Sequence, residues 1–173
     1  SHGTAFATFV TFARDAFRWL RGEAGIRRWR SSPDSERAFC GRCGSKLPAL
    51  EPFPYAFAGP LEGELGAVPS GHIFVGSKAP WHTIDDALPR YEAFREGGVA
   101  LPTPRHTEVA ADRIRGGCLC GAVAYEIRGP LASGAIVSCH CSRCRRGKAA
   151  VHGSNLFVDE RLFAWLRGDE RLV

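Results

Sequence analysis

The chain has 173 residues, of which 45% are apolar and 24% are charged, and its formal net charge is +5. This composition is typical of a folded globular protein and argues against a disordered chain. No apolar run approaches the roughly 18–20 residues of a spanning helix, and the N-terminus lacks a secretory signal, so we expect a cytoplasmic protein without a membrane partner.

The first half of the chain predicts short strands separated by turns. Residues 4–12 are rich in Phe, Thr and Val and predict a strand, and a helical turn from Asp15 to Leu20 should follow and end at Gly22. A second strand is expected to include Ile26–Trp29, with a turn over residues 31–33. Residues 72–75 predict another short strand.

The second half resumes this pattern after an irregular segment. Residues 96–115 lose periodicity and carry several Gly and Pro residues, which predicts a linker. Residues 117–127 predict a half-buried strand that starts at a cysteine pair, and residues 135–138 predict a strand that leads to a cysteine triplet. Many short strands and few helical turns predict a mainly β fold.

One segment of the sequence occurs twice. His2-Gly3 followed by Phe17–Gly22 (FRWLRG) recurs as His152-Gly153 followed by Phe163–Gly168 (FAWLRG). The first copy continues to a cysteine pair at Cys40, whereas the second stops before any such pair. We therefore expect both ends of the chain to cut through a tandem repeat.

The seven cysteines fall into three groups with the spacing of metal ligands. These are Cys40 and Cys43 (C-x-x-C), Cys118 and Cys120 (C-x-C), and Cys139, Cys141 and Cys144 (C-x-C-x-x-C). An odd number at such short spacing fits disulfides poorly, and the glycine after each cysteine of the first pair is typical of a zinc knuckle. We expect two zinc ions: the two pairs supply four thiolates for a closed structural site, and the triplet supplies three ligands with an open fourth position. A disulfide framework and an iron–sulfur or redox site are the alternatives.

The open site favours thiol chemistry over hydrolysis. Three thiolates and Zn²⁺ carry a net charge of −1, so the ion should activate water poorly and hold a fourth, exogenous thiolate well. Alternatively, His140 or His152 fills the fourth position and makes the site structural. His152 is the stronger competitor, because His140 lies inside the triplet with its side chain expected to point away.

Basic residues after the triplet indicate a local anion site. Seven thiolates at −1 and two Zn²⁺ at +2 lower the formal charge from +5 to +2, which leaves no strong general attraction to nucleic acid. Arg145, Arg146 and Lys148 are candidates for holding the carboxylates of a peptide-like thiol, with Lys78 a weaker candidate. The alternative is that these are solvated surface charges.

The cysteine motifs and their surroundings resemble the glutathione-dependent formaldehyde-activating enzymes and the related centromere protein V family. The similar segments are Gly116–Val123 (GGCLCGAV), Cys139–Cys144 (CHCSRC), Phe39–Gly44 (FCGRCG) and His72–Trp81 (HIFVGSKAPW). The resemblance implies a small, mostly antiparallel fold called the β-tent, with a structural zinc on the two pairs and a catalytic zinc on the triplet. It also implies a carbon–sulfur lyase that adds glutathione reversibly to formaldehyde, giving S-hydroxymethylglutathione. A non-catalytic zinc module for protein or nucleic-acid interaction is the alternative, and a truncated structural remnant is a second one.

The order of the motifs departs from that family, in which the C-x-C pair and the triplet precede the C-x-x-C pair. We interpret residues 1–95 as the second half of one such domain and residues 116–173 as the first half of the next. Our hypothesis is that the halves fold together as a circularly permuted domain, or are exchanged between two chains in a homodimer. One domain has one place for the duplicated segment, so one copy should be frayed or pair with a second chain. Residues 145–155 depart from the pattern usual after the triplet, whereas residues 1–9 fit it.

Overall fold

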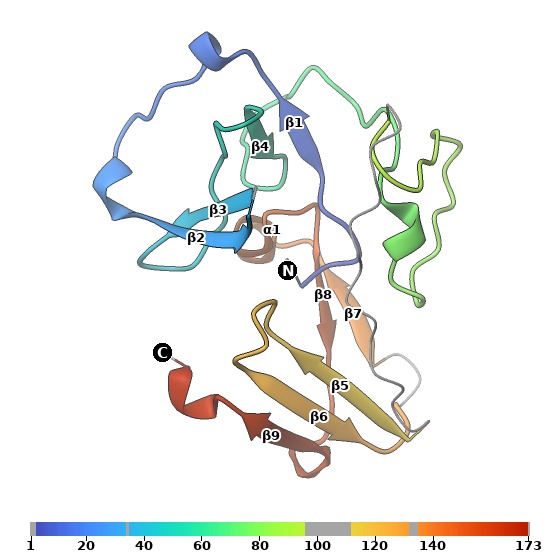
Figure 1. The fold of residues 1–173 in the computed structure, drawn as a ribbon. Helices are drawn as coiled ribbons and strands as arrows, with labels where there is room; N and C mark the ends of the chain where they lie inside the picture. Colours follow the sequence, from blue (N-terminus) through green and yellow to red (C-terminus); the bar gives the residue numbers. More distant parts are fainter. Residues whose placement is uncertain (1–2, 34, 96–111, 132–134, 173) are drawn as a thin grey trace. The chain divides into compact units, whose positions relative to one another are not determined.

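The computed structural model describes residues 3–33, 35–95, 112–131 and 135–172 (Figure 1). The chain forms two compact units, Ser1–Pro60 with Thr107–Val173, and Leu61–His106. The first unit therefore combines residues from both halves of the sequence and contains all seven cysteines.

Four small antiparallel sheets make up the regular structure of the first unit. Their strands are β1 (Phe9–Thr11) with β4 (Tyr55–Phe57), β2 (Ile26–Ser32) with β3 (Ser35–Cys40), β7 (Ile136–Cys139) with β8 (Gly153–Leu156), and β5 (Arg113–Gly117), β6 (Ala124–Arg128) and β9 (Phe163–Arg167) in the order β5–β6–β9. The described residues add one α-helix, α1 (Ser142–Lys148), and the 3-10 turns η1 (Arg14–Ala16), η2 (Glu23–Gly25), η3 (Val75–Ser77), η4 (Glu160–Leu162) and η5 (Asp169–Arg171). The mainly β class is thus confirmed.

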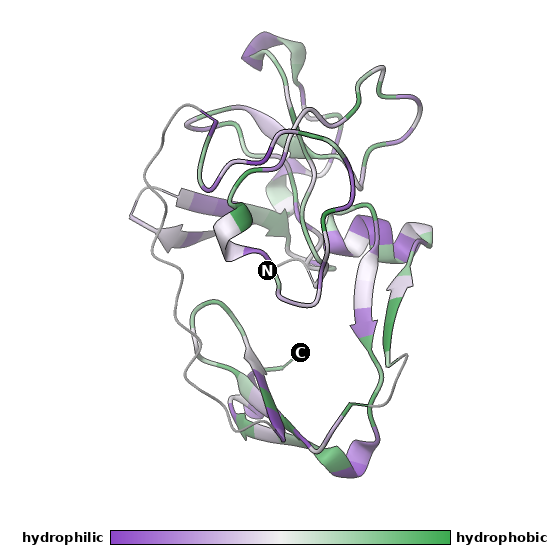
Figure 2. Ribbon diagram, turned by 90° about the vertical axis from the view of Figure 1, so that its right-hand side faces the viewer, coloured by the Kyte–Doolittle hydropathy of each residue, from purple (hydrophilic) through white to green (hydrophobic). Residues whose placement is uncertain are grey.

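The three-stranded sheet has one aromatic face. Tyr125 of β6 lies opposite Trp165 of β9, and its ring stacks on Phe163 with the ring centroids 5.4 Å apart. A Cβ atom at Gly116 of β5 would lie 2.2 Å from Cζ of Tyr125, so the glycine leaves room for this ring. Alternation along the strands, visible as purple and green stripes in Figure 2, follows from the period of two in a β-strand.

The opposite face carries a buried carboxylate. Glu126 of β6 is 2% exposed, and its oxygens accept hydrogen bonds from Arg113 Nη1 at 3.2 Å, Arg115 Nε at 3.2 Å and Arg128 Nε at 3.0 Å. These guanidinium groups, Arg128 first, hold the pKa of Glu126 below its ordinary value against the opposing effect of burial. The charge of Glu126 is therefore compensated by three partly exposed arginines.

Contacts also join the segment after the triplet to the N-terminal half. The backbone of Gly59 packs directly on Ala150, and the Gly59 carbonyl accepts a hydrogen bond of 2.8 Å from Arg145 Nη1. The Ser154 amide donates to the Gly3 carbonyl at 3.0 Å. The buried apolar residues of the described chain are few and mostly small: Ala38, Ala49, Ala56, Phe57, Ile127, Ala149 and Ala150.

The second unit has little regular structure in its described residues. The strand expected over 72–75 is wrong: His72 makes an isolated bridge with Arg90, and Val75 begins η3. His72 Nε2 lies 3.0 and 3.1 Å from the two carboxylate oxygens of Asp86. Lys78 Nζ donates to the backbone carbonyls of Ala79 and His82, so this lysine braces a local turn.

Several expected boundaries in the first unit are wrong. The strand over residues 4–12 is limited to β1, and the helical turn over 15–20 is limited to η1, after which Phe17 is extended. Ser31 and Ser32, expected in a turn, belong to β2. The strand over 117–127 is two strands with the cysteine pair in the turn between them, and residues 113–115 of the expected linker lie in β5. Residues 96–111 of that linker lie outside the described residues.

The sequence analysis did not predict α1, and it left open which repeat copy is paired. The second copy forms β9, whereas residues 17–22 of the first copy lie outside every strand. Of the helices in the described ranges, none has the length and apolar character needed to cross a membrane.

Candidate metal centre

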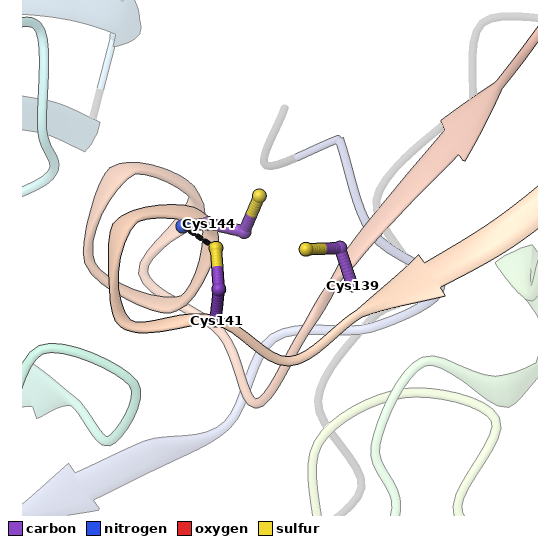
Figure 3. A group of neighbouring side chains, drawn as sticks. All are labelled: Cys139, Cys141 and Cys144. Atoms are coloured by element: carbon purple, nitrogen blue, oxygen red, sulfur yellow. Dashed lines mark hydrogen bonds between the residues drawn. The ribbon is translucent and has the colours of Figure 1, made fainter.

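The three sulfurs of the triplet converge at the junction of β7 and α1 (Figure 3). Cys139 is the last residue of β7, Cys141 is the N-cap of α1, and Cys144 lies in its first turn. The three sulfur atoms lie within 4.8 Å of one another. A zinc ion with bonds of about 2.3 Å to sulfur needs its ligands about 3.8 Å apart, so small adjustments would bring these thiols into a tetrahedral arrangement.

Hydrogen bonding makes the three thiols unequal. The backbone N–H of Cys144 donates to Cys141 Sγ at 3.4 Å and, with the neighbouring thiols, lowers the pKa of Cys141 to about 7. Hydrogen bonds from the Cys144 thiol to the sulfurs of Cys139 and Cys141 raise the pKa of Cys144 to about 11, and burial and the repulsion of a further thiolate by these neighbours add to the effect. A divalent cation among the sulfurs would remove this repulsion, so the donor set fits a metal that prefers thiolates.

The fourth position has no ligand from the described residues. No histidine, carboxylate or further cysteine among them joins the three sulfurs within 4.8 Å. The His152 ring lies edge-on to Phe6 with centroids 5.8 Å apart, and its centroid is 5.4 Å from that of His140. This geometry gives no support to either histidine as a fourth ligand.

A glycine that the sequence analysis did not assign to the site lies against the triplet. Gly153 of β8 is buried and lies opposite Cys139 in the β7–β8 ladder. A Cβ atom at Gly153 would lie 3.4 Å from Cβ of Cys144 and 3.7 Å from its sulfur. The His-Gly dipeptide present in both repeat copies was the available signal for this residue.

The first cysteine pair forms a knuckle at the end of β3. Gly44 follows Cys43 with a φ of 70° and donates its N–H to the Cys40 carbonyl at 2.9 Å. The left-handed conformation explains the glycine at this position. Cys43 Sγ lies 3.3 Å from Ser45 Oγ, and hydrogen bonds from Ser45 lower the pKa of Cys43. The turn therefore favours a thiolate.

The second pair forms a corresponding turn between β5 and β6. Gly121 follows Cys120 with a φ of 76° and donates its N–H to the Cys118 carbonyl at 3.0 Å. The Val123 amide donates to Cys118 Sγ at 3.1 Å and lowers the pKa of Cys118. The sulfurs of Cys118 and Cys120 are 3.3 Å apart, so this pair also presents two adjacent ligands.

The structure does not bring these two pairs together. Their four sulfurs form no group of three or more ligands within 4.8 Å, although all four cysteines lie in the described part of the chain. All seven cysteines are free thiols, which gives no support to a disulfide framework. The four-thiolate site therefore stays a prediction.

Three of the basic candidates, Arg145, Arg146 and Lys148, lie on the largely hydrophilic helix α1 (Figure 2). Arg145 is partly buried because it donates to the Gly59 carbonyl, and Lys148 Nζ lies beside Gly3. Arg146 is exposed. Lys78 belongs to the other compact unit.

Comparison with known proteins identifies part of the chain. None of the curated proteins matches it, and none of the solved structures does. A family model matches residues 113–173, which include the C-x-C pair and the triplet but not Cys40 or Cys43. Over residues 113–173 the chain matches the family described as glutathione-dependent formaldehyde-activating enzyme, which confirms the resemblance for the segments Gly116–Val123 and Cys139–Cys144.

Proposed function

We propose that the chain is a zinc-dependent carbon–sulfur lyase that joins glutathione to formaldehyde and forms S-hydroxymethylglutathione. The observation that carries this proposal is the triplet, whose three sulfurs converge without a fourth ligand from the described residues, inside the segment that matches the family model. Zinc bound to Cys139, Cys141 and Cys144 would supply a Lewis-acidic centre that keeps an added thiol in its thiolate form.

The reaction requires one new bond and one proton transfer. The glutathione sulfur bonds to the carbonyl carbon of formaldehyde, the carbon–oxygen π bond opens, and the thiol proton ends on the hydroxymethyl oxygen. The task of the protein is to hold the sulfur and the aldehyde together, which replaces a bimolecular encounter by a local one.

Basic side chains beside the triplet fit the carboxylates of glutathione. Arg145 directly follows Cys144 on α1, and Arg146 and Lys148 lie one and three residues further on. These side chains are therefore close to Cys144 along the helix. Charge-assisted hydrogen bonds from these groups would orient the tripeptide with its thiol toward the sulfurs. Arg145 has a second task, since it also binds the Gly59 carbonyl.

We further propose that Cys40, Cys43, Cys118 and Cys120 hold a structural zinc. Each pair already lies in a turn whose hydrogen bonds favour a thiolate. The buried core is small and consists mainly of alanine, so burial alone stabilises this chain weakly. A zinc ion held by four thiolates would join the two halves and so compensate for the small core.

The two halves are proposed to form one circularly permuted domain of the β-tent type. Support comes from the packing of Gly59 on Ala150 and from the Ser154–Gly3 hydrogen bond. An exchange of halves in a homodimer would satisfy the same contacts. Free thiols agree with the proposed reducing, cytoplasmic location. The partner that we propose is a small thiol, not nucleic acid.

Exchange NMR with ¹³C-formaldehyde, glutathione and the zinc-loaded full chain tests the activity. We expect magnetisation transfer between free and glutathione-bound formaldehyde to exceed the uncatalysed rate, and Cys141→Ser to return it to that rate. Arg171→Ala, at an exposed site, is the matched control and should keep full activity. A chain that binds two zinc ions but gives no acceleration would be a non-catalytic zinc module.

A further inference from the structure

The two repeat copies have the same local backbone. In each, a 3-10 turn leads into a Phe-x-Trp-Leu-Arg segment whose Phe is extended and which is followed by a left-handed glycine, with φ 77° and ψ 13° at Gly22 and φ 77° and ψ 14° at Gly168. The Phe and Trp rings meet edge-to-face in both, with centroids 4.9 Å apart. The first copy therefore shares these local features with β9 although it lies outside every strand.

In the second copy, this shape serves the contact with β6. Phe163 lies opposite Ile127, and Trp165 lies opposite Tyr125. Arg167 Nε donates to the Gly121 carbonyl at 2.8 Å, and a Cβ atom at Gly168 would lie 2.3 Å from the Ala122 oxygen. The segment thus braces the turn that holds Cys118 and Cys120.

The first copy has the same groups without this contact. Phe17, Trp19, Arg21 and Gly22 occupy the equivalent positions. A Cβ atom at Gly22 would meet nothing within 4 Å, and Leu20 is 81% exposed. Both copies therefore carry the residues that fit β6, but it is the second copy that pairs with this strand.

In the register of β9, the first copy would add one polar contact. Its Arg18 would lie opposite Glu126, where β9 places Ala164. An ionised carboxylate has about four acceptor positions, and the described arginines donate three hydrogen bonds to Glu126. Arg18 can supply the fourth.

We propose that Phe17–Arg21 is a second strand for β6 and takes the place of β9 within the same chain when β9 is released. Both segments belong to the same compact unit. Two segments of one chain meet at an effective concentration that reaches about the millimolar range, which favours exchange within a molecule over pairing between molecules. The sheet that carries the C-x-C turn would then be closed by either copy.

Proline substitutions at equivalent positions of the two copies test this exchange. Proline fits poorly within a strand, so Ala164→Pro should release β9, and Arg18→Pro should disable the other copy. Hydrogen exchange of residues 124–128 in the zinc-loaded full chain is the measurement. We expect each single variant to keep protection within about 10-fold of the parent and the double variant to lose about 100-fold or more.

Charge reversal provides a test that does not depend on proline. Arg18→Glu places a second carboxylate opposite Glu126 only after the exchange, so it should reduce protection in the Ala164→Pro background and leave the parent unchanged. Three results would overturn the proposal. The first is that residues 124–128 of Ala164→Pro exchange as fast as those of the double variant, and the second is that the double variant keeps its protection. The third is that the protection of Ala164→Pro rises with protein concentration and a dimer forms.

Discussion

The backbone of Gly59 lies so close to that of Ala150 that a Cβ atom at residue 59 would be 2.4 Å from both the nitrogen and the oxygen of Ala150. Arg145 of α1 adds a hydrogen bond to the Gly59 carbonyl. The helix that carries Cys144 is thus fixed on the N-terminal half of the chain.

Gly59→Ala should weaken this attachment. Backbone atoms at 2.4 Å cannot move aside as a flexible side chain does, so we expect a loss of about 1–3 kcal/mol in the free energy of unfolding. Denaturant unfolding of the zinc-loaded protein measures this loss. Gly147→Ala is the control, because its Cβ would meet nothing within 4 Å on a helix, and it should be neutral or stabilising by up to about 1 kcal/mol. Equal stability of the two variants would show that this contact does not support the fold.

Cys141→Ser and Cys40→Ser should have different effects on metal content and folding. The first change removes a ligand of the open site, so the protein should lose one zinc and its activity but keep its fold. The second breaks the proposed four-thiolate site and should unfold the first unit. Zinc analysis combined with circular dichroism distinguishes the outcomes. A stably folded Cys40→Ser protein would contradict the assignment of the structural site.

Arg146→Ala should raise the KM for glutathione about 10-fold and change kcat little, because it removes ground-state and transition-state binding equally. Steady-state rates over a range of glutathione concentrations give both constants. Arg171→Ala should leave both unchanged. Unchanged kinetics in Arg146→Ala would identify Arg146 as a solvated surface charge.

Glu126→Gln should reduce the dependence of stability on pH in acid. Because the pKa of Glu126 is lowered in the folded state, its charge stabilises the fold above its unfolded pKa of about 4.3, and this contribution disappears as the pH falls through the folded value. The variant should therefore be less stable than the parent at pH 7, with the difference vanishing in acid. Unfolding in denaturant at several pH values measures this difference. Glu36→Gln, which changes an exposed pair with Arg28, should show little of it.

The sequence predicted the grouping of the three triplet cysteines better than the elements that hold them. Residue type and spacing were sufficient for the triplet, since ligands within six positions are brought together by one strand end and one helical turn. The extended strand over 117–127 failed because Gly121 in its left-handed conformation ends the pairing and creates a turn around Cys118. Alternation of apolar residues alone does not reveal such a break.

Local sequence patterns did not predict contacts between residues that are far apart in the sequence. Glu126 has the sequence neighbours of an exposed strand residue, and its burial depends on arginines from β5 as well as from β6. The helix α1 is short and polar, so it has no apolar periodicity to detect. The sequence around Gly59 did not indicate its importance either, because Gly59 packs on the backbone of Ala150, which is distant in sequence.

In each paired-cysteine turn, the glycine after the second cysteine donates to the carbonyl of the first, as in the Gly44–Cys40 and Gly121–Cys118 bonds. A newly synthesised chain can therefore bind an ion through two sulfurs before segments that are distant in sequence come into contact. In the proposed four-thiolate site, the metal would then take part in folding, because its capture by the second turn would draw together segments that apolar collapse alone would leave apart.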